Sequence, residues 1–422
     1  MSNQTRPLRT EGILSKIFEG DKRLWLLYAT FIIVSFFAVS SASSARMYSF
    51  LMSQQGTNPV FKHVVVLLFC LGTAVIVSKF PVEWYRRKKY LLALIVGVFI
   101  VALWLNPTEA NQASRWTRIM GISIQPSEFF KLIIVLYGAE IGAKVAKMRR
   151  EHFPLAKKYA HLFFLIYWFV IVAITLSINL TNLSTTFILI SFLFLYTITL
   201  RAPLSFILRV FVLLFVAGAL LVSALLFIPE DTLRKIHHRS PVWQQRLYHI
   251  AEDPSSDKEY YNLEEGSTQS KLALVAISRG QVPSGLGKSK TRDYLPLAYS
   301  DYIYAIIVEE WGVVGMLFVP SLYLLWFLWV GRLAQREENM YRRYVLLGFG
   351  LLYPFSALIN LMVASGMFIT GQPLPLISDG GSSYLSASIA VGIVIGISRS
   401  QTKIRELDRR EQEILSAAET EA

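Results

Sequence analysis

The amino-acid sequence predicts an all-α polytopic membrane protein with ten transmembrane helices and a large extracytoplasmic loop between helices 7 and 8. Three observations support this fold class. Hydrophobic residues make up 54% of the 422 residues and charged residues only 17%, whereas about a quarter of a typical soluble domain is charged. Apolar runs of helix length recur along the chain. Lys and Arg residues lie mainly between these runs, as in polytopic membrane proteins.

The ten predicted spans follow from the length that a bilayer requires. A membrane-crossing helix needs about 20 mainly apolar residues. The runs that meet or approach this length are 24–42, 61–80, 90–105, 129–145, 161–178, 185–200, 204–228, 302–330, 344–369 and 382–397. The first run is too long for a signal peptide and is followed by further spans, so we interpret it as an uncleaved anchor.

The basic residues predict the orientation of these spans, because cytoplasmic loops carry an excess of Lys and Arg. With the N-terminus inside, the cytoplasmic loops carry Arg86, Arg87, Lys88, Lys89, Lys144, Lys147, Arg149, Arg150, Lys157, Lys158, Arg201, Arg332, Arg336, Arg342 and Arg343. The outer loops carry few cations, among them Arg46 and Lys62. Both termini are therefore predicted to be cytoplasmic.

This orientation gives a simple domain organisation. A cytoplasmic tail (1–23) precedes the ten-helix domain (24–399), and a second cytoplasmic tail (400–422) follows it. The large extracytoplasmic loop is 229–300. Loops of this length are often functional, although a partly mobile insert is the alternative. The net charge of +13 fits the positive-inside bias, and we expect no nucleic-acid partner.

The first polar cluster begins in the outer loop before the fourth span. Arg115 and Arg118 are cations on the less basic side of the membrane, which favours an anionic ligand. Trp116 lies between them, and a lone tryptophan here is also typical of an interface anchor.

The same cluster continues into the fourth span. Pro126 suits the first turn of a helix, with Gln125 or Ser127 as its cap. Glu128 and Lys131 lie on one face of that helix because they are three positions apart. The alternative to a functional role is a local ion pair at a capped helix end.

The second cluster is at the entry to the eighth span. Asp301 ends the large loop, and an N-cap aspartate is the alternative to a catalytic carboxylate. Glu309 and Glu310 follow within the span itself. Two acids in one membrane helix indicate a polar cavity rather than lipid contact.

The third cluster, 370–383, lies between the last two spans. Irregular backbone at membrane depth is tolerated only against protein or water, and its glycines permit close approach of the backbone to a ligand. An ordinary tight extracellular turn is the alternative. The candidate binding residues of this cluster are Pro375, Ser378, Gly380, Gly381 and Ser382.

Nucleotide and metal sites find little support in the sequence. Residues 285–289 (GLGKS) resemble the end of a phosphate-binding P-loop, but Val282 stands where that motif needs glycine, and no strand–helix context exists. Cys70 is the only cysteine, so a disulfide within the chain and a cysteine-based metal site are excluded. No cofactor is certain. A divalent cation (Mg or Mn) is compatible with the sequence, but no dedicated ligand set is visible.

Taken together, the three clusters resemble the SEDS family, the FtsW and RodA polytopic proteins of bacterial cell-wall synthesis. The elements that carry the resemblance are RW…QPSE…K, SDYIYA…EEWG and GQPLPLISDGGSS, in this order and on one side of ten spans. The charged tails at both ends favour the division-type FtsW over the elongation-type RodA.

The resemblance implies a peptidoglycan glycosyltransferase that polymerises lipid II into β-1,4 glycan strands at the outer face of the bacterial inner membrane. Asp301 matches the essential acid of the family, and we interpret it as the general base. The binding residues that match are Trp116, Glu128, Lys131, Pro375, Ser378, Gly380, Gly381 and Ser382. The resemblance also implies a class B penicillin-binding protein, other division proteins and membrane lipids as partners, at the division septum.

Two departures from the family pattern stand near these residues. Leu297 replaces a glutamate that often precedes the essential acid, and Asp379 replaces a tyrosine. Asp379 places an unexpected negative charge near an anionic substrate. A lipid II flippase is the main alternative function, with polar residues within the spans lining its path. These residues are Lys131, Glu140, Lys144, Glu309 and Glu310.

Overall fold

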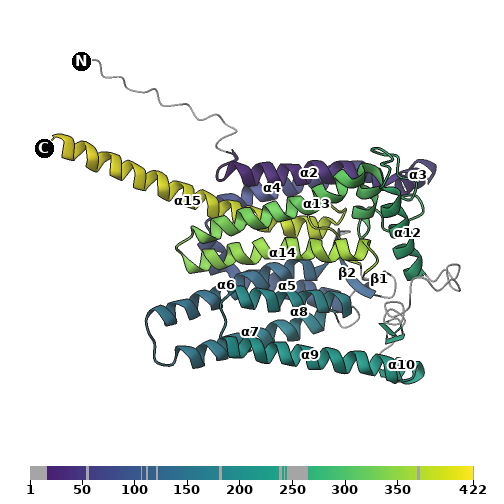
Figure 1. The fold of residues 1–422 in the computed structure, drawn as a ribbon, viewed down its shortest axis with the longest axis horizontal. Helices are drawn as coiled ribbons and strands as arrows, with labels where there is room; N and C mark the ends of the chain where they lie inside the picture. Colours follow the sequence, from purple (N-terminus) through teal and green to yellow (C-terminus); the bar gives the residue numbers. More distant parts are fainter. Residues whose placement is uncertain are drawn as a thin grey trace, which may run out of the picture.

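The computed structural model describes residues 17–53, 57–105, 107–110, 113–119, 122–179, 183–236, 240–241, 243–244, 265–367 and 371–421. Its long helices run side by side as an elongated bundle (Figure 1). The helices are α2 (Lys22–Ala42), α3 (Ser44–Ser53), α4 (Pro59–Lys79), α5 (Val82–Leu105), α6 (Pro126–Arg150), α7 (Ala156–Asn179), α8 (Leu183–Thr199), α9 (Leu204–Phe227), α10 (Glu230–Ile236), α12 (Glu265–Arg279), α13 (Ile303–Gln335), α14 (Met340–Ala364) and α15 (Gly381–Glu421).

Seven helices of the described part of the chain are long and apolar enough to cross a membrane, and they identify an integral membrane protein. These are α2, α4, α7, α9, α13, α14 and α15. Each overlaps one of the predicted spans. The other three predicted spans fall in α5, α6 and α8, and the apolar part of α8 is only Ser184–Thr199.

The core of the bundle is built around α14, which contacts both α13 and α6, while α15 packs along α4. Gly348 of α14 shows how closely these helices approach. A Cβ atom at Gly348 would lie 2.5 Å from Val135 of α6 and 2.9 Å from Tyr196 of α8. Small residues commonly permit such crossings in membranes, where packing rather than water exclusion drives helix association.

Within the residues that the structure describes, the loop between α5 and α6 is where strands depart from the all-helical prediction. It forms a three-stranded antiparallel sheet of β1 (Pro107–Ala110), β2 (Ala113–Ile119) and β3 (Ile122–Ile124), in the order β1-β2-β3. β-Branched residues recur in β2 and β3, and such residues favour strands. The runs are too short to stand out from an irregular loop in the sequence.

The strands, α3, α10 and α12 lie at one end of the bundle, and the C-terminus lies beyond the other end (Figure 1). The large loop is therefore partly folded: α12 packs against α13 and α14. Residues 245–264 of this loop lie outside the described residues. The predicted C-terminal tail continues α15 as far as Glu421, and its described side chains between Thr402 and Ser416 are exposed.

Candidate active site

Asp301 lies in a tight turn just before α13, and it does not cap that helix. The N-cap residue is Tyr302, without a side-chain hydrogen bond, so the N-cap interpretation of Asp301 is wrong. The Asp301 amide donates to the carbonyl of Leu297 at 3.1 Å, and Leu297 has a φ of 57°. The Ser300 hydroxyl donates to Asp301 Oδ1 at 3.0 Å. The carboxyl group is thus held on a sharply turned segment.

A buried asparagine fixes the backbone of Asp301 from inside the bundle. Asn360 of α14 is fully buried, and its Nδ2 donates to the Asp301 carbonyl at 2.8 Å and to the Gln372 carbonyl at 2.6 Å. The Gln372 side chain in turn donates to Thr185 of α8 at 3.1 Å. The two bonds from Asn360 Nδ2 therefore tie the Asp301 turn to the loop that carries Gln372, although Asn360 Oδ1 has no hydrogen-bond partner within the described part of the chain. Asp301 is therefore positioned by the rigid part of the fold.

The third cluster folds as a buried loop, and this is not the arrangement of an exposed turn. Ser378 donates to the Ser300 carbonyl at 2.6 Å and accepts from the Leu374 amide at 2.7 Å. The Tyr323 hydroxyl donates to the carbonyl of Pro375. Pro375 and Ser378 are both buried. These two predicted binding residues shape the wall that supports the Asp301 turn.

Asp379, the unexpected acid, is neutralised by its neighbours. Its carboxylate lies 2.8 Å from Arg46 Nη1 and 3.5 Å from His63 Nδ1. The Arg46 guanidinium also stacks over the ring of Tyr299, 3.5 Å from its centroid. The Asp379 amide donates to the Tyr299 carbonyl at 2.9 Å. Asp379 therefore joins α3, α4 and the Asp301 turn, and it is an anchor rather than a repulsive charge.

The same contacts set the ionisation of Asp379. Burial raises its pKa, but the hydrogen bond from His63 and the charge of Arg46 outweigh burial and lower the pKa below its ordinary value of 3.8. A carboxyl whose pKa is lower in the folded state stabilises the fold above its unfolded pKa. This stabilisation is lost as the pH falls through the folded pKa.

We expect replacement of Asp379 by asparagine to lower the melting temperature at neutral pH. The difference from the wild type should be full above the unfolded pKa of about 3.8, shrink as the pH falls below it, and disappear below the folded pKa, because Asp379 is then protonated in both states. Thermal melting over a pH series measures this, with Asp408→Asn in the exposed end of α15 as control. A difference that stays constant across the series would contradict the charged pair.

The first cluster forms the buried start of α6. Pro126 is its first residue, as predicted, and Gln125 is the N-cap residue without a side-chain cap. Glu128 and Lys131 form an ion pair at 2.7 Å, and both are buried. The Ser386 hydroxyl of α15 donates to the Glu128 carbonyl at 2.7 Å. The local ion pair is therefore present, and α15 holds it in place.

The start of α15 joins the first and third clusters. The Gln125 amide donates to the Ser382 hydroxyl at 3.4 Å. A Cβ atom at Gly381 would meet no other atom within 4 Å, and one at Gly380 would make only ordinary contacts. Packing therefore does not require glycine at either position, which is compatible with an open approach to the first turn of α15.

Arg115, Trp116 and Arg118 are placed by their backbone. All three lie in β2, where Trp116 pairs with Thr108 of β1 and Arg118 pairs with Ser123 of β3. The structure describes only the backbone of these three residues. β3 contacts α15, so the sheet adjoins the helix that joins the other clusters.

Glu309 and Glu310 bind a segment of the large loop. The Glu309 carboxylate accepts from the amide of Lys290 at 3.2 Å and from the hydroxyl of Thr291 at 3.1 Å. The Glu310 carboxylate accepts from the amides of Gly287 at 3.1 Å and Ser289 at 3.2 Å. We define residues 284–292 with these two acids as the carboxylate latch. The structure places this loop segment where the sequence predicted a polar cavity, so both carboxylates bind groups of the same chain.

Three residues that position the site were missed from the sequence. Arg46 was used only for orientation, and Asn360 and His63 were not singled out. A signal existed for the last two, because an asparagine and a histidine interrupt otherwise apolar runs, and polar residues in membrane spans commonly have a specific partner. Among the described residues no three His, Cys, Asp or Glu side chains gather in a group that could hold a metal ion.

A family model and several curated proteins match most of the length of the chain. The family model FtsW/RodA/SpoVE, described as "Cell cycle protein", matches residues 21–403. A "Probable peptidoglycan glycosyltransferase FtsW" from Hahella chejuensis is 29% identical over 349 residues, covering 80% of each chain. A protein of the same name from Halomonas elongata is 28% identical over 403 residues, covering 92% of each chain.

Solved structures share the fold at lower sequence identity. A chain from "Structural coordination of polymerization and crosslinking by a peptidoglycan synthase complex" has a TM-score of 0.65 and 20% identity, covering 90% of this chain and 98% of that chain. The rod shape determining protein RodA of Thermus thermophilus has a TM-score of 0.60 and 19% identity, covering 90% and 97%. The helical bundle is therefore a RodA-like polytopic fold.

Proposed function

This chain belongs to the FtsW/RodA/SpoVE family, and we propose that it polymerises lipid II with Asp301 as the general base. The activity class is peptidoglycan glycosyl transfer, the activity named for the curated relatives. The observation that carries the assignment of Asp301 is its position: a carboxyl group on a turn that Ser300, Asn360 and Ser378 hold from three sides.

We propose ten membrane spans, with α5, α6 and α8 completing the seven most apolar helices. In this arrangement both termini are in the cytoplasm, and the sheet, α12 and Asp301 are at the outer face of the inner membrane. The basic residues between spans support this orientation. The FtsW name of the relatives supports septal wall synthesis during division.

The reaction needs one base at the acceptor sugar. The 4-hydroxyl of the acceptor GlcNAc is a weak nucleophile at neutral pH, and a positioned carboxylate that takes its proton contributes to the rate. The hydroxyl oxygen then attacks C1 of the donor MurNAc, the bond from C1 to the pyrophosphate oxygen breaks, and the anomeric configuration inverts. Undecaprenyl pyrophosphate leaves without needing strong protonation.

Cations near the start of α6 are suited to the developing pyrophosphate charge. Arg115 and Arg118 of β2 are assigned this role together with Lys131. Lys131 is paired with Glu128 in the structure, so its charge is shared before substrate arrives. A divalent cation (Mg or Mn) would add to this neutralisation, but the described residues do not fit a protein-held metal site, and no step is assigned to one.

The proposed protein partner is a class B penicillin-binding protein, a transpeptidase that crosslinks the new strand, alongside other division proteins and membrane lipids. The support is the fold shared with a chain of a peptidoglycan synthase complex that couples polymerisation and crosslinking.

A lipid II flippase remains the alternative, and the buried charges favour the polymerase. Glu140 pairs with Arg86 at 2.6 Å and with Lys144 at 3.8 Å. Glu309 and Glu310 are engaged in the carboxylate latch, and Lys131 binds Glu128. These acids and lysines are therefore held in local contacts, which is not what a polar path across the bilayer would need.

A reconstitution experiment tests the function. We expect the purified protein with its cognate penicillin-binding protein to convert fluorescent lipid II into glycan strands, measured by gel electrophoresis. A parallel assay in liposomes measures transfer of lipid II between leaflets. Transfer without polymerisation would overturn the proposal in favour of a flippase. A protein that shows neither transfer nor polymerisation would instead be a non-catalytic scaffold.

Two variants at the start of α6 distinguish a structural role of Lys131 from a role in the reaction. The first replaces Lys131 by methionine. It leaves the Glu128 carboxylate buried without its cation, which costs about 3–5 kcal/mol of stability. The double variant Glu128→Gln/Lys131→Met removes both charges, so its melting temperature should recover. If Lys131 acts on pyrophosphate, polymerisation by the double variant stays about 100-fold slower than wild type. A stable and fully active double variant would remove Lys131 from the site.

A further inference from the structure

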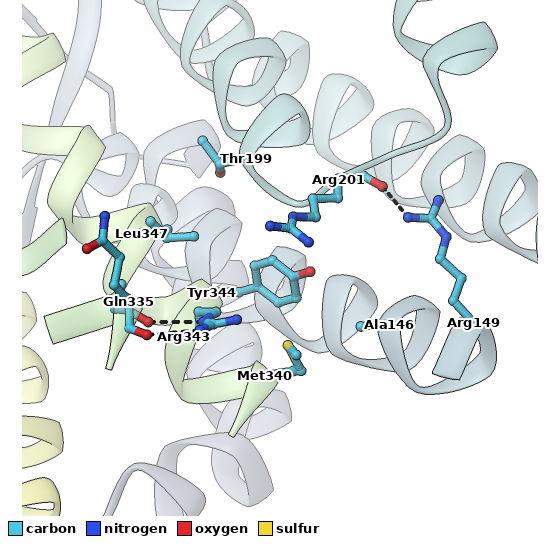
Figure 2. A pocket seen from close by; sticks show the side chains of 10 residues that line it. Ala146, Arg149, Thr199, Arg201, Gln335, Met340, Arg343, Tyr344 and Leu347 are labelled. Atoms are coloured by element: carbon cyan, nitrogen blue, oxygen red, sulfur yellow. Dashed lines mark hydrogen bonds between the residues drawn. The ribbon is translucent and has the colours of Figure 1, made fainter. Parts of the chain in front are cut away.

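A cavity of about 460 Å³ lies at the opposite end of α13 from Asp301 (Figure 2). Its walls come from the ends of α6, α8, α13 and α14 and from the turn that leads into α9. The lining residues are Ala146, Arg149, Thr199, Arg201, Ala334, Gln335, Met340, Arg343, Tyr344 and Leu347. We name this cavity the arginine pocket. The site proposed for polymerisation does not include any part of it.

The charge of the arginine pocket is positive and unbalanced. Of the described residues that line it, three are arginines and none is acidic. Arg149, Arg201 and Arg343 take part in no ion pair within the described part of the chain. Basic residues close by in sequence are paired: Lys147 lies 3.7 Å from Glu151, and Arg342 lies 2.6 Å from Glu83. The pocket thus combines three positive charges that the fold leaves uncompensated.

Hydrogen bonds to main-chain carbonyls hold two of these arginines in place. Arg149 Nη1 donates to the carbonyl of Arg201 at 2.8 Å. Arg343 donates through Nε and Nη2 to the carbonyls of Ala334 and Gln335, both at 3.0 Å. Each of these guanidinium groups keeps donors that these bonds do not use. Two of the three cations are therefore positioned by the main chain, although Arg149, like Arg201, is exposed.

Arg201 is the least constrained of the three. It has a φ of 54°, so its backbone turns sharply between α8 and α9, and Figure 2 shows its side chain beside Tyr344 in the middle of the pocket. Tyr344 is buried, with 4% of its surface exposed. The guanidinium of Arg201 and the ring of Tyr344 give the pocket a polar centre beside an aromatic wall.

Apolar side chains line part of the pocket, and others are exposed on α9, the helix that begins shortly after Arg201. Leu347, Met340 and Ala146 line part of the cavity. Leu204, shortly after Arg201 at the start of α9, is 70% exposed, and Leu208 is 54% exposed. A ligand with an anionic group and an attached hydrocarbon chain can therefore place the anion among the arginines and the chain along α9.

We propose that the arginine pocket binds the phosphate group of an anionic phospholipid from the cytoplasmic leaflet. Arginine matches phosphate oxygens with paired donors, and basic pockets between membrane helices on the cytoplasmic side accept such headgroups. A soluble phosphate ester shares this chemistry. The lipid is favoured because the cavity lies at the helix ends, beside exposed apolar surface of α9.

Binding of a short-chain lipid tests the proposal directly. The probe is dihexanoyl phosphatidylglycerol added to the full-length protein in a neutral detergent, with affinity measured by calorimetry and bound lipids counted by native mass spectrometry. Arg201→Gln should weaken binding about tenfold, the loss expected for one charge-assisted contact. Ala146→Trp should abolish binding altogether, because the larger side chain fills the cavity without changing any charge.

Arg150→Gln is the matched control, because Arg150 is an exposed arginine at the same end of α6 that does not line the pocket. It should change the affinity less than about twofold, because Arg150 lies outside the pocket and its charge would act on the ligand only over a longer, screened distance. Equal weakening by Arg150→Gln and Arg201→Gln, or undiminished binding to Ala146→Trp, would overturn the proposal. Inorganic phosphate should compete only weakly; full competition at the lipid's own concentration would overturn the lipid assignment in favour of a soluble phosphate.

Discussion

Replacement of Asp301 by asparagine should lower the rate of glycan polymerisation by about 10²–10⁴-fold, the contribution typical of a general base. Asparagine is nearly isosteric with aspartate but cannot take a proton from the acceptor hydroxyl. Two of the contacts that hold the turn use main-chain carbonyls of Asp301 and Ser300, and the Oδ1 atom of asparagine can still accept from the Ser300 hydroxyl, so these contacts survive the substitution. We therefore expect loss of activity without loss of fold.

The measurement is the initial rate of strand formation from lipid II by the purified protein with its transpeptidase partner. Asp293→Asn is the matched control: Asp293 is an exposed aspartate of the same loop whose carboxylate contacts only Ser44 in the described contacts. It should keep most of the activity. Melting temperatures of both variants should stay close to the wild type. An Asp301→Asn protein that polymerises at the wild-type rate would remove this carboxyl from the mechanism.

The membrane helices could be predicted from sequence because each depends on a local property. An apolar run of sufficient length specifies a span almost without regard to the rest of the chain. Pro126 likewise marked the start of α6 through its own geometry. The three short strands were missed because their pattern is only a few residues long and the partners are set by pairing across the loop.

The electrostatics of the site could not be predicted, because the decisive partners are distant in sequence. Asp379 looked repulsive until the structure placed Arg46 beside it, 333 positions away in the chain. The N-cap interpretation of Asp301 was reasonable from its position before α13, but the turn at Leu297 moves the start of the helix past it. Only the fold decides which charges meet.

The segment 285–289 is a second case in which the binding partner of a sequence motif could not be predicted. Its glycines suggested the end of a phosphate-binding loop, and the sequence context argued against a nucleotide. In the structure the amides of Gly287 and Ser289 do bind an anion, and that anion is the Glu310 carboxylate of the same chain. Successive backbone amides form such anion-binding nests irrespective of the ligand's origin.

The carboxylate latch ties the large loop to α13 where that helix is interrupted. Gly312 has a φ of 65°, and a Cβ atom there would lie 3.2 Å from both the Gly280 carbonyl and Pro283. The carbonyls of Glu309 and Glu310 accept from the amides of Ser284 and Gly285 at 3.0 and 3.1 Å. The latch therefore uses the backbone and the side chains of both acids. The loop segment that they hold, 284–292, ends shortly before Asp301 in the chain.

Replacement of Glu310 by glutamine should release this segment and reduce polymerisation by up to about 100-fold, because the stretch that leads into the Asp301 turn then loses one of its supports and only the contacts of Asn360 and Ser378 still hold the turn. The amide nitrogen of glutamine is a donor, so it cannot accept from both Gly287 and Ser289. Leaving such buried donors unpaired costs about 1–3 kcal/mol each. Hydrogen exchange should show faster exchange over 284–300, while α14 keeps its protection.

Glu338→Gln removes an exposed acid just beyond the other end of α13 and serves as the control for this variant. It should alter neither exchange nor polymerisation. The pattern expected for Glu310→Gln separates a positioning role from general unfolding: exchange should rise in the latch and the Asp301 turn, while the melting of the bundle changes little. Normal polymerisation combined with a released loop would show that the latch does not position the base, and uniform exchange throughout the bundle would show that Glu310 supports the whole fold instead.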